Sequence, residues 1–342
     1  MSPAELKAAL LAEAQALGFD LCRVAPAQVP PHAEEFRQWL ADGRHGEMAW
    51  LARNADRRSD PQLVLPGAKS VLMLATNYWQ PAPAAAAAGS GRIARYAWGD
   101  DYHEIMEPKL WQLDAWLQLH DGMQRQYVDT GPVLERDLAA LAGLGWQGKS
   151  TMLIHPRVGT FFFLASIFTT LELPPDEPMR DHCGSCTRCI TACPTGAITA
   201  PQQLDARLCV SYLTIENKGS IPESLRPLMG DRIYGCDDCL DACPWNRFAT
   251  AARETRFAAR DFVGMALRDF LALDADAFRT LFRKSPIKRI KRRGLLRNVC
   301  VALGNVGTAA DLPALERAAQ DPEPLIAEHA TWAIARIGER RS

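Results

Sequence analysis

The stretch CGSCTRCITACPTGAIT, residues 183–199, places four cysteines at intervals of three, three and four residues, and a proline follows the last one. Further along, YGCDDCLDACPWN, residues 234–246, has the same pattern without its first cysteine. Of the ten cysteines in the chain, eight lie in this part of it: Cys183, Cys186, Cys189, Cys193, Cys209, Cys236, Cys239 and Cys243. In a reducing compartment such a concentration favours metal ligation over disulfides.

The spacing C-x2-C-x2-C-x3-C-P is typical of bacterial two-cluster ferredoxins, in which the fourth cysteine binds the other cluster. We therefore expect a crossed ligand arrangement in which Cys209 replaces the ligand that the second motif lacks. The predicted [4Fe-4S] sites are Cys183, Cys186, Cys189 and Cys243 for the first, and Cys193, Cys209, Cys236 and Cys239 for the second. The alternative, a pair of zinc ribbons, would use paired C-x2-C steps. Cys22 and Cys300 are interpreted as small buried apolar residues.

Length, charge and the amino-terminal segment narrow the class of protein. The chain has 342 residues, enough for two or three domains, and a formal net charge of −1, so no global field draws it to nucleic acid or membrane. The start of the sequence predicts an amphipathic helix with a capping box formed by Ser2 and Glu5, rather than an export signal. No apolar run approaches the ~18 residues needed to span a bilayer. We expect a cytoplasmic protein without membrane association.

Residues 1–177 read as an α/β region. Apolar runs at 70–75, 126–128 and 160–170 predict strands, and the periodicity of residues 106–117 and 134–141 predicts helices between them. The low-complexity segment PAPAAAAAGSG, residues 81–91, predicts a surface loop.

Two polar motifs stand out in this region, RYAWGDDYH at residues 95–103 and VDTGPVLERDLAALAGLGWQGKSTMLI at residues 128–154. In the second, Asp129 follows a predicted strand and precedes a Thr-Gly-Pro turn. A carboxylate at a strand end is a common catalytic placement, but Asp129 could equally serve as the N-cap of the following helix. The chain has neither a Walker A motif nor a G-x-G-x-x-G fingerprint, so nucleotide cofactors are not indicated.

The segment RKSPIKRIKRRGLLR, residues 283–297, carries eight basic residues and no acidic one. A solvated helix face is the usual explanation of a charge run, whereas an uninterrupted positive sign favours phosphate contacts. The residues predicted to contact phosphates are Lys288, Arg289, Lys291, Arg292 and Arg293. The helical sequence that follows has a faint 34-residue period, seen in VALG at 301–304 and ARIG at 335–338, which is similar to a HEAT-like helical pair.

Taken together, these motifs resemble those of the epoxyqueuosine reductases, cobalamin-dependent iron–sulfur enzymes that complete queuosine at the wobble position of tRNA. The shared stretches run across nearly the whole chain. They are RYAWGDDYH, VDTGPVLERDLAALAGLGWQGKS, both cysteine motifs, CVSYLTIENKG (209–219), GDRIYGCDDCLDACPWN (230–246) and SPIKR with GLLRNVCVALGN (285–305).

The resemblance implies a three-part chain that acts as a monomer. Residues 1–177 would form an α/β (α+β) cobalamin-binding catalytic domain, residues 178–250 a ferredoxin-like domain with two [4Fe-4S] clusters, and residues 251–342 an all-α, HEAT-like module that binds tRNA. The substrate would be tRNA carrying epoxyqueuosine in the anticodon loop. An external one-electron donor of the flavodoxin or ferredoxin type would supply the electrons.

The resemblance also assigns roles to single residues. Asp129 matches the proposed proton donor, and it must carry a proton when the substrate is bound. The motifs that line the substrate pocket contribute Tyr102, His103 and Arg136. The residues expected at the cobalamin are Arg53, Arg58, Asp129, Leu153, Leu164, Ser211, Tyr212, Asp237 and Asp238. The corrinoid signature D-x-H-x-x-G is met only in part at residues 101–106, where the glycine is absent, so His103 is not predicted to bind cobalt.

Two other functions are compatible with parts of this pattern. A reductive dehalogenase-like corrinoid enzyme would share cobalamin and both clusters but act on a small halogenated molecule. It normally carries an export signal and lacks a basic helical tail. An electron-transfer or RNA-binding adaptor would need no acid at position 129.

Overall fold

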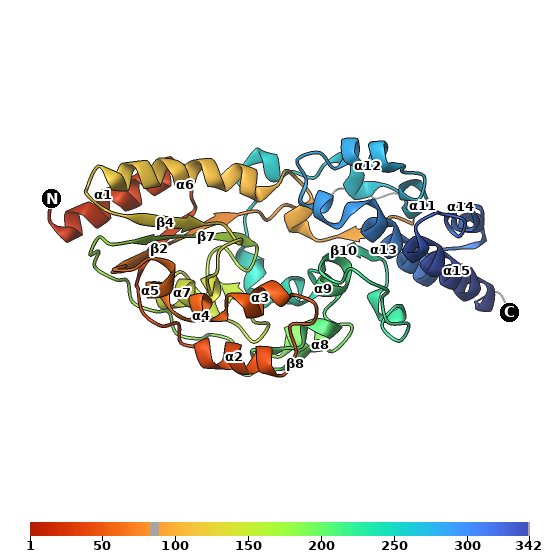
Figure 1. The fold of residues 1–342 in the computed structure, drawn as a ribbon, viewed down its shortest axis with the longest axis horizontal. Coiled ribbons are helices and arrows are strands. Elements are labelled where there is room, and N and C mark those ends of the chain that lie inside the picture. The colour runs from red at the N-terminus through yellow and green to blue at the C-terminus, as the bar shows by residue number, and fades with distance from the viewer. Residues whose placement is uncertain (83–88, 341–342) are drawn as a thin grey trace.

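The chain is described by a computed structural model that places residues 1–82 and 89–340 (Figure 1). Most of the predicted loop at 81–91 therefore lies outside the described residues. The molecule is elongated in this view, with the amino-terminal sheet and its helices at one end and the carboxy-terminal helices at the other. In the part that is described, no helix is both long enough and apolar enough to cross a membrane.

A four-stranded antiparallel sheet forms the amino-terminal part, in the order β1-β2-β7-β4. Its strands are β1 (Leu21–Pro26), β2 (Ser70–Asn77), β7 (Phe162–Thr169) and β4 (Gln124–Tyr127). The central strand β2 is buried along its whole length, which explains why its sequence SVLMLATN is a continuous apolar run rather than an alternating one. The three predicted strands are confirmed, whereas β1 was not predicted.

Helices cover both faces of this sheet (Figure 1). On one face, α1 (Pro3–Ala16) and α6 (Tyr102–Gln118) pack on the even-numbered side chains of β2, such as Leu72 and Leu74. On the other face, α5 (Pro61–Val64) and α7 (Glu135–Leu141) pack on the odd-numbered ones. The predicted capping box between Ser2 and Glu5 is present at the start of α1. The sheet thus fixes the loop after β4, which leads into α7.

Shorter elements connect the sheet to the cysteine segment. The remaining amino-terminal helices are α2 (Ala33–Ala41), α3 (Ala49–Arg53) and α4 (Ala55–Ser59). Three two-stranded pairs follow, β3 (Arg92–Ile93) with β10 (Arg232–Tyr234), β5 (Trp146–Gln147) with β6 (Leu153–Ile154), and β8 (Ile198–Ala200) with β9 (Gln203–Leu204). The cysteine segment itself contains α8 (Arg188–Ala192), α9 (Val210–Ile215) and α10 (Asp238–Asp241).

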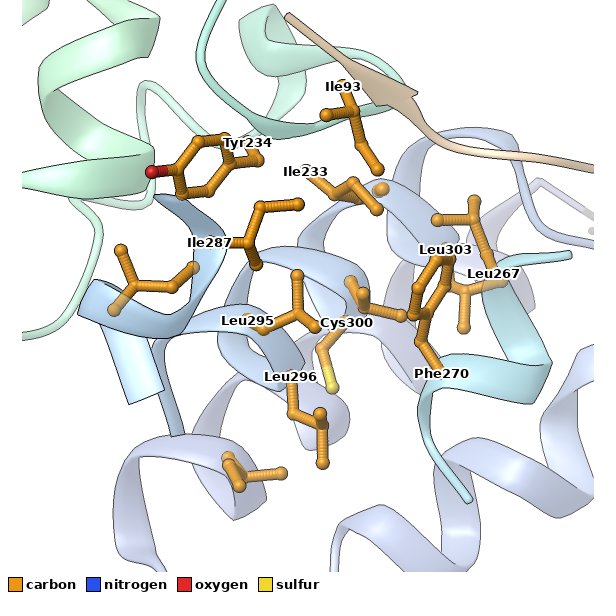
Figure 2. Packing of buried hydrophobic residues seen from close by; sticks show 14 of the residues in the cluster. Ile93, Ile233, Tyr234, Leu267, Phe270, Ile287, Leu295, Leu296, Cys300 and Leu303 are labelled. Atoms are coloured by element: carbon orange, nitrogen blue, oxygen red, sulfur yellow. The ribbon is translucent and has the colours of Figure 1, made fainter. Parts of the chain in front are cut away.

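The carboxy-terminal part is helical and packs around α13 (Lys291–Val306). Its other helices are α11 (Leu267–Phe270), α12 (Ala275–Leu281), α14 (Leu312–Ala318) and α15 (Pro324–Glu339). Figure 2 shows its core, where Leu295, Cys300 and Leu303 of α13 meet Ile93 of β3 and Ile233 of β10. Cys300 is fully buried there, as predicted for a small apolar residue. Because this core includes strands from earlier in the chain, the helices are attached directly to the segments that surround the candidate site.

Candidate active site and iron–sulfur centres

The first group of cysteines lines a single cavity. Cys183, Cys186 and Cys189 of the first motif line it together with Cys243, which closes the second motif. Burial raises the pKa of Cys243, and the neighbouring thiols of the first motif raise it further. The structure therefore brings together the four cysteines that the crossed arrangement predicts for the first site.

The second group lies deeper in the molecule. Burial raises the pKa of Cys239 well above its ordinary value, and the thiols of Cys209, Cys236 and Cys193 add to this effect. Burial likewise raises the pKa of Cys236 to about 12. Uncompensated thiolates are therefore unfavourable here, and a bound cationic centre would stabilise them. Among the described residues, no three His, Cys, Asp or Glu side chains converge as they would around a single metal ion.

Asp129 lies two residues beyond the end of β4, on a strained turn. Its φ angle is +60°, and the N–H of Thr130 donates to the carbonyl oxygen of Val128 at 2.6 Å. This is a γ-turn of the uncommon type, in which a residue with a side chain adopts positive φ. Asp129 caps no helix, because α7 begins at Glu135 with Leu134 as its N-cap. Of the two roles left open by the sequence, the capping role is therefore wrong.

Two side chains hold the Asp129 turn. The hydroxyl of Tyr102 donates to Oδ2 of Asp129 at 2.6 Å, and Oε1 of Glu135 accepts the backbone N–H of Asp129 at 3.3 Å. Tyr102 is itself fixed, since its ring stacks on Phe163 at 4.2 Å between centroids. Burial and the charge of Asp129 raise the pKa of Tyr102, so its hydroxyl stays protonated and can donate. Tyr102 of α6 thus orients the carboxyl of Asp129, and Glu135 of α7 holds the backbone of the turn.

Glu135 is a site residue that the sequence analysis missed. Burial, followed by the nearby charge of Asp129, raises the pKa of Glu135 to about 8. Arg58 lies on the same side, buried, with Nη1 donating to the carbonyl oxygen of Val133 at 3.1 Å and its guanidinium 5.1 Å from the Trp50 ring centre. The spacing of Glu135 from Asp129 gave no signal by itself, because the bond of its carboxyl to the Asp129 N–H appears only in the fold.

His103 and Arg136 occupy two sides of the same region. Nδ1 of His103 lies 2.7 Å from Oδ1 of Asp101, the N-cap of α6, and the imidazole stacks on Tyr102 with centroids 4.1 Å apart. Its Nε2 is buried and has no partner among the described residues. Nη1 of Arg136 donates to the carbonyl oxygen of Thr151 at 2.8 Å. Of the three residues predicted for the pocket, only Tyr102 is seen to bond to Asp129 among the described residues, and His103 stacks on Tyr102.

In the basic run, some side chains form ion pairs within the molecule and others do not. Three of its members form ion pairs within the molecule: Lys288 with Glu104 at 3.2 Å, Arg289 with Glu216 at 2.6 Å and Arg292 with Asp321 at 2.6 Å. Lys291 and Arg293 are exposed, and neither forms an ion pair with any described residue. Glu216 and, to a smaller extent, Asp129 raise the pKa of Arg289, so the three charged groups lie near one another.

The residues predicted around the cobalamin are more dispersed. Arg53 is exposed at the end of α3, whereas Arg58 adjoins the Asp129 turn. The Tyr212 hydroxyl accepts the backbone N–H of Glu47 at 2.8 Å. Oδ2 of Asp237 accepts the backbone N–H of Arg95 at 2.7 Å, and burial raises the pKa of Asp237 to about 6.

The other predicted cobalamin contacts differ in exposure. Asp238 forms ion pairs with Arg92 and Arg232. Leu153 is buried, and Ser211 on α9 is partly exposed. Leu164 is the one residue of β7 that is not buried. The sheet therefore exposes part of one apolar side chain at Leu164. The same strand carries Phe163, whose ring stacks on Tyr102.

The two groups of four cysteines and the oriented carboxyl of Asp129 together indicate an iron–sulfur oxidoreductase. Comparison with family models agrees with this class. Residues 182–246 match the model described as a 4Fe-4S double cluster binding domain, and residues 58–130 match epoxyqueuosine reductase QueG, DUF1730.

Curated relatives and solved structures extend the match over the whole chain. The chain is 43% identical to the epoxyqueuosine reductase of Xanthomonas campestris over 98% of its own length and 97% of the relative. It is 41% identical to that of Escherichia coli K12, over 95% and 88%. A crystal structure of epoxyqueuosine reductase with an epoxyqueuosine-modified tRNA stem loop superimposes with a TM-score of 0.90 at 31% identity, covering 98% of this chain and 90% of that one. The chain belongs to the epoxyqueuosine reductase family.

Proposed function

We propose that the protein reduces epoxyqueuosine to queuosine at the wobble position of tRNA. The observation that carries this proposal is the oriented carboxyl of Asp129, held by Tyr102 and Glu135 on a strained turn within a chain that also holds two four-cysteine centres. The related enzyme crystallised with a modified tRNA stem loop supports the same substrate. Residues 1–177, 178–250 and 251–342 would act as catalytic, cluster-binding and tRNA-binding parts of one cytoplasmic monomer.

Two [4Fe-4S] clusters are expected, one in each group of cysteines. Cys183, Cys186, Cys189 and Cys243 would bind the first, and Cys193, Cys209, Cys236 and Cys239 the second. The support is the cavity lined by the first group and the mutual influence of the thiols in the second. Because each cluster accepts one electron at a time, an external one-electron donor of the flavodoxin or ferredoxin type must act twice in each turnover.

Cobalamin fits the residues beside Asp129. The open apolar point at Leu164 and the exposed side of the Asp129 turn would accept a flat macrocycle, with Arg58, Ser211, Tyr212 and the 236–239 loop around its edge. When bound, the cofactor would supply a strongly reducing metal centre for the epoxide carbon. The exposed Asp129 carboxyl would then become enclosed, in the way that a proton donor at an apolar site requires.

The chain's own residues would manage the protons of the reaction. Converting the epoxide to an alkene consumes two electrons and two protons, and the oxygen leaves as water. Negative charge builds on that oxygen as its bond to carbon breaks, and the Asp129 carboxyl would protonate it there. The Tyr102 hydroxyl then stabilises the carboxylate that remains. Glu135, protonated at neutral pH, would hold the turn without placing a second negative charge beside Asp129.

Substrate binding would combine the pocket with a phosphate-binding surface. Arg136 and His103 would contact the modified base, and Lys291 and Arg293 on the first turn of α13 would contact phosphates. Lys288, Arg289 and Arg292 are engaged with carboxylates, so their contribution to phosphate binding is expected to be smaller.

The proposed function is tested by reconstitution. Anaerobically purified protein is loaded with iron, sulfide and cobalamin, supplied with a chemical reductant, and incubated with epoxyqueuosine-containing tRNA. Mass spectrometry of the released nucleoside should show the loss of one oxygen and the appearance of queuosine. The visible spectrum should show iron–sulfur absorbance that reductant bleaches, and a corrin band that shifts on binding. Unchanged epoxyqueuosine in the presence of both intact spectra would reject the proposed function.

A further inference from the structure

The cysteines of both groups are partly exposed, but different side chains surround the two groups. All members of the first group are partly exposed, and their cavity is also lined by Lys149, His182, Arg188 and Trp245. In the second group burial is the main cause of the raised pKa values of Cys209, Cys236 and Cys239. Electron transfer requires close approach of the two redox centres, and the cavity of the first group offers an external donor a place of approach.

Aromatic rings continue from the first site to the surface. The Trp146 ring lies 5.0 Å from Trp245 and 5.2 Å from His182, and Trp245 lies 6.0 Å from Phe248. Phe248 is 44% exposed, and the Arg247 guanidinium lies 4.5 Å from its ring centre. Exposed aromatic side chains stacked with arginine are the composition typical of the energetically dominant centre of a protein interface.

The charge at the mouth of this site is positive. Arg188 lines the cavity, Arg247 follows Trp245 by two residues, and Lys149 donates to the carbonyl oxygen of Gly184 at 2.6 Å. None of the three forms an ion pair with any residue that the structure describes. The neighbouring acid Asp181 accepts the backbone N–H of Cys183 at 2.6 Å. In a chain of net charge −1 this is a local excess of positive charge.

We propose that Lys149, Arg188, Trp245, Arg247 and Phe248 form a docking face for an acidic one-electron carrier protein. This donor face rests on the proposed function only in requiring that the cysteine groups hold redox clusters. At each encounter the reduced carrier loses one electron and the cluster of the first site gains it. Two encounters supply the two electrons of one turnover. The free cations attract an acidic carrier and orient it, and the exposed Phe248 supplies the apolar contact at close range.

The test measures cluster reduction rather than tRNA conversion. The double variant Arg188→Glu/Arg247→Glu is mixed anaerobically with reduced flavodoxin, used as the acidic carrier, and the bleaching of iron–sulfur absorbance is followed in a stopped-flow instrument. Electrostatic steering accounts for roughly 10- to 10³-fold in association rate, so reduction should slow at least ~10-fold at low salt and converge with wild type at high salt. Reduction by the small, cationic methyl viologen radical should not slow. Arg317→Glu, an exposed charge reversal on α14, is the matched control and should leave both rates unchanged.

The possible outcomes distinguish the donor face from an RNA-binding surface, and they test it separately from the proposed function. If flavodoxin reduces the double variant as fast as wild type, or if Arg317→Glu slows it equally, the donor face is wrong. Should the double variant lose iron on purification, Phe248→Ala keeps the charges and tests the same face, with slower reduction by flavodoxin alone expected. Loss of tRNA affinity with normal flavodoxin reduction would make this face an RNA surface and overturn the proposal. Normal reduction of the clusters without conversion of modified tRNA would reject the proposed function and leave the donor face standing.

Discussion

The cysteine centres and the Asp129 pocket are assembled in different ways. In the centres most ligands come from two short motifs, each with fixed spacing, and the fold contributes mainly the crossing of Cys193 and Cys243 between them. In the pocket, Asp129, Tyr102 and Glu135 come from a turn and two helices, and hydrogen bonds hold them together. A cluster site loses its function when one ligand is removed, whereas the pocket should lose function in steps.

The largest effect is expected from the crossing cysteines. Cys193→Ser and Cys209→Ser should each remove the second cluster, and Cys243→Ser the first, with about four irons lost per protein and electron delivery abolished. Iron analysis and electron paramagnetic resonance of the reduced proteins measure this. If Cys193→Ser and Cys243→Ser changed the same signal, the crossed arrangement would be wrong, and the two motifs would be independent sites.

A large but incomplete loss is expected from Asp129→Asn. Asparagine keeps the shape and can adopt positive φ, but it has no carboxylic proton to give. Turnover of modified tRNA with a chemical reductant should fall about 10²- to 10⁴-fold. The clusters, cobalamin binding and tRNA affinity should remain. Activity within a few-fold of wild type would remove Asp129 from the mechanism, and would indicate that the pocket works by positioning alone.

The double-cluster segment could be predicted from the sequence because ligand spacing is a local property. The grouping of Cys243 with the first motif follows from a known pattern, and the structure brings these cysteines together. Asp129 was recognised because a strand end followed by a Thr-Gly-Pro turn is also local. Glu135 was missed because its importance depends on burial and on a bond to a backbone N–H, which spacing does not encode.

The same reasoning explains what the sequence could not predict in the basic run and in the sheet. Eight positive charges are plain in the sequence, but the carboxylates that engage them are distant along the chain; Glu104, for example, lies 184 residues before Lys288. Charge alone could not separate the committed Arg292 from its free neighbour Arg293. Strand β1 was overlooked because LCRVAP contains an arginine and a proline and lacks a clear alternation.

An intermediate and pH-dependent effect is expected from Glu135. The folded chain keeps the proton of Glu135 up to its pKa of about 8, whereas an unfolded chain releases it near 4.5. The stability contributed by the protonated carboxyl is therefore complete below about 4.5 and is lost as the pH rises through about 8. Glu135→Gln is always neutral, so its stability should not fall over this range. Between pH 5 and 9, the free energy of unfolding of this variant should therefore rise by roughly 2 kcal/mol relative to that of the wild type. Each pKa unit is worth ~1.4 kcal/mol, and solvent reduces the effect of the full shift.

Thermal unfolding at several pH values measures this difference, and equal slopes for the two proteins would contradict the raised pKa. Activity gives a second measurement. Glu135→Gln retains an oxygen that can accept the Asp129 N–H, so turnover at neutral pH should stay within a few-fold of wild type. Glu135→Ala frees the strained turn and should lose about tenfold, the effect of about 1.4 kcal/mol. If alanine and glutamine behaved alike, the hydrogen bond would have no positioning role.

The smallest effect is expected on the exposed basic surface, where single contacts are worth little. Each phosphate contact contributes ~0.9 to the slope of log K against log salt, because one condensed counterion is released. Lys291→Ala/Arg293→Ala should therefore lower the salt slope of tRNA binding by roughly one to two units and weaken binding uniformly across tRNA sequences.

Arg292→Ala is the matched control. Its guanidinium is bound to Asp321 and to the carbonyl oxygen of Leu273, so its removal should reduce the stability of the helical part while leaving the slope nearly unchanged. Fluorescence anisotropy measures the salt slope of tRNA binding for the two variants. The comparison thus distinguishes basic side chains that form no ion pair from those that do. An equal decrease in both would mean that tRNA breaks the ion pair on binding, and an unchanged slope in both would place the RNA contact elsewhere on the molecule.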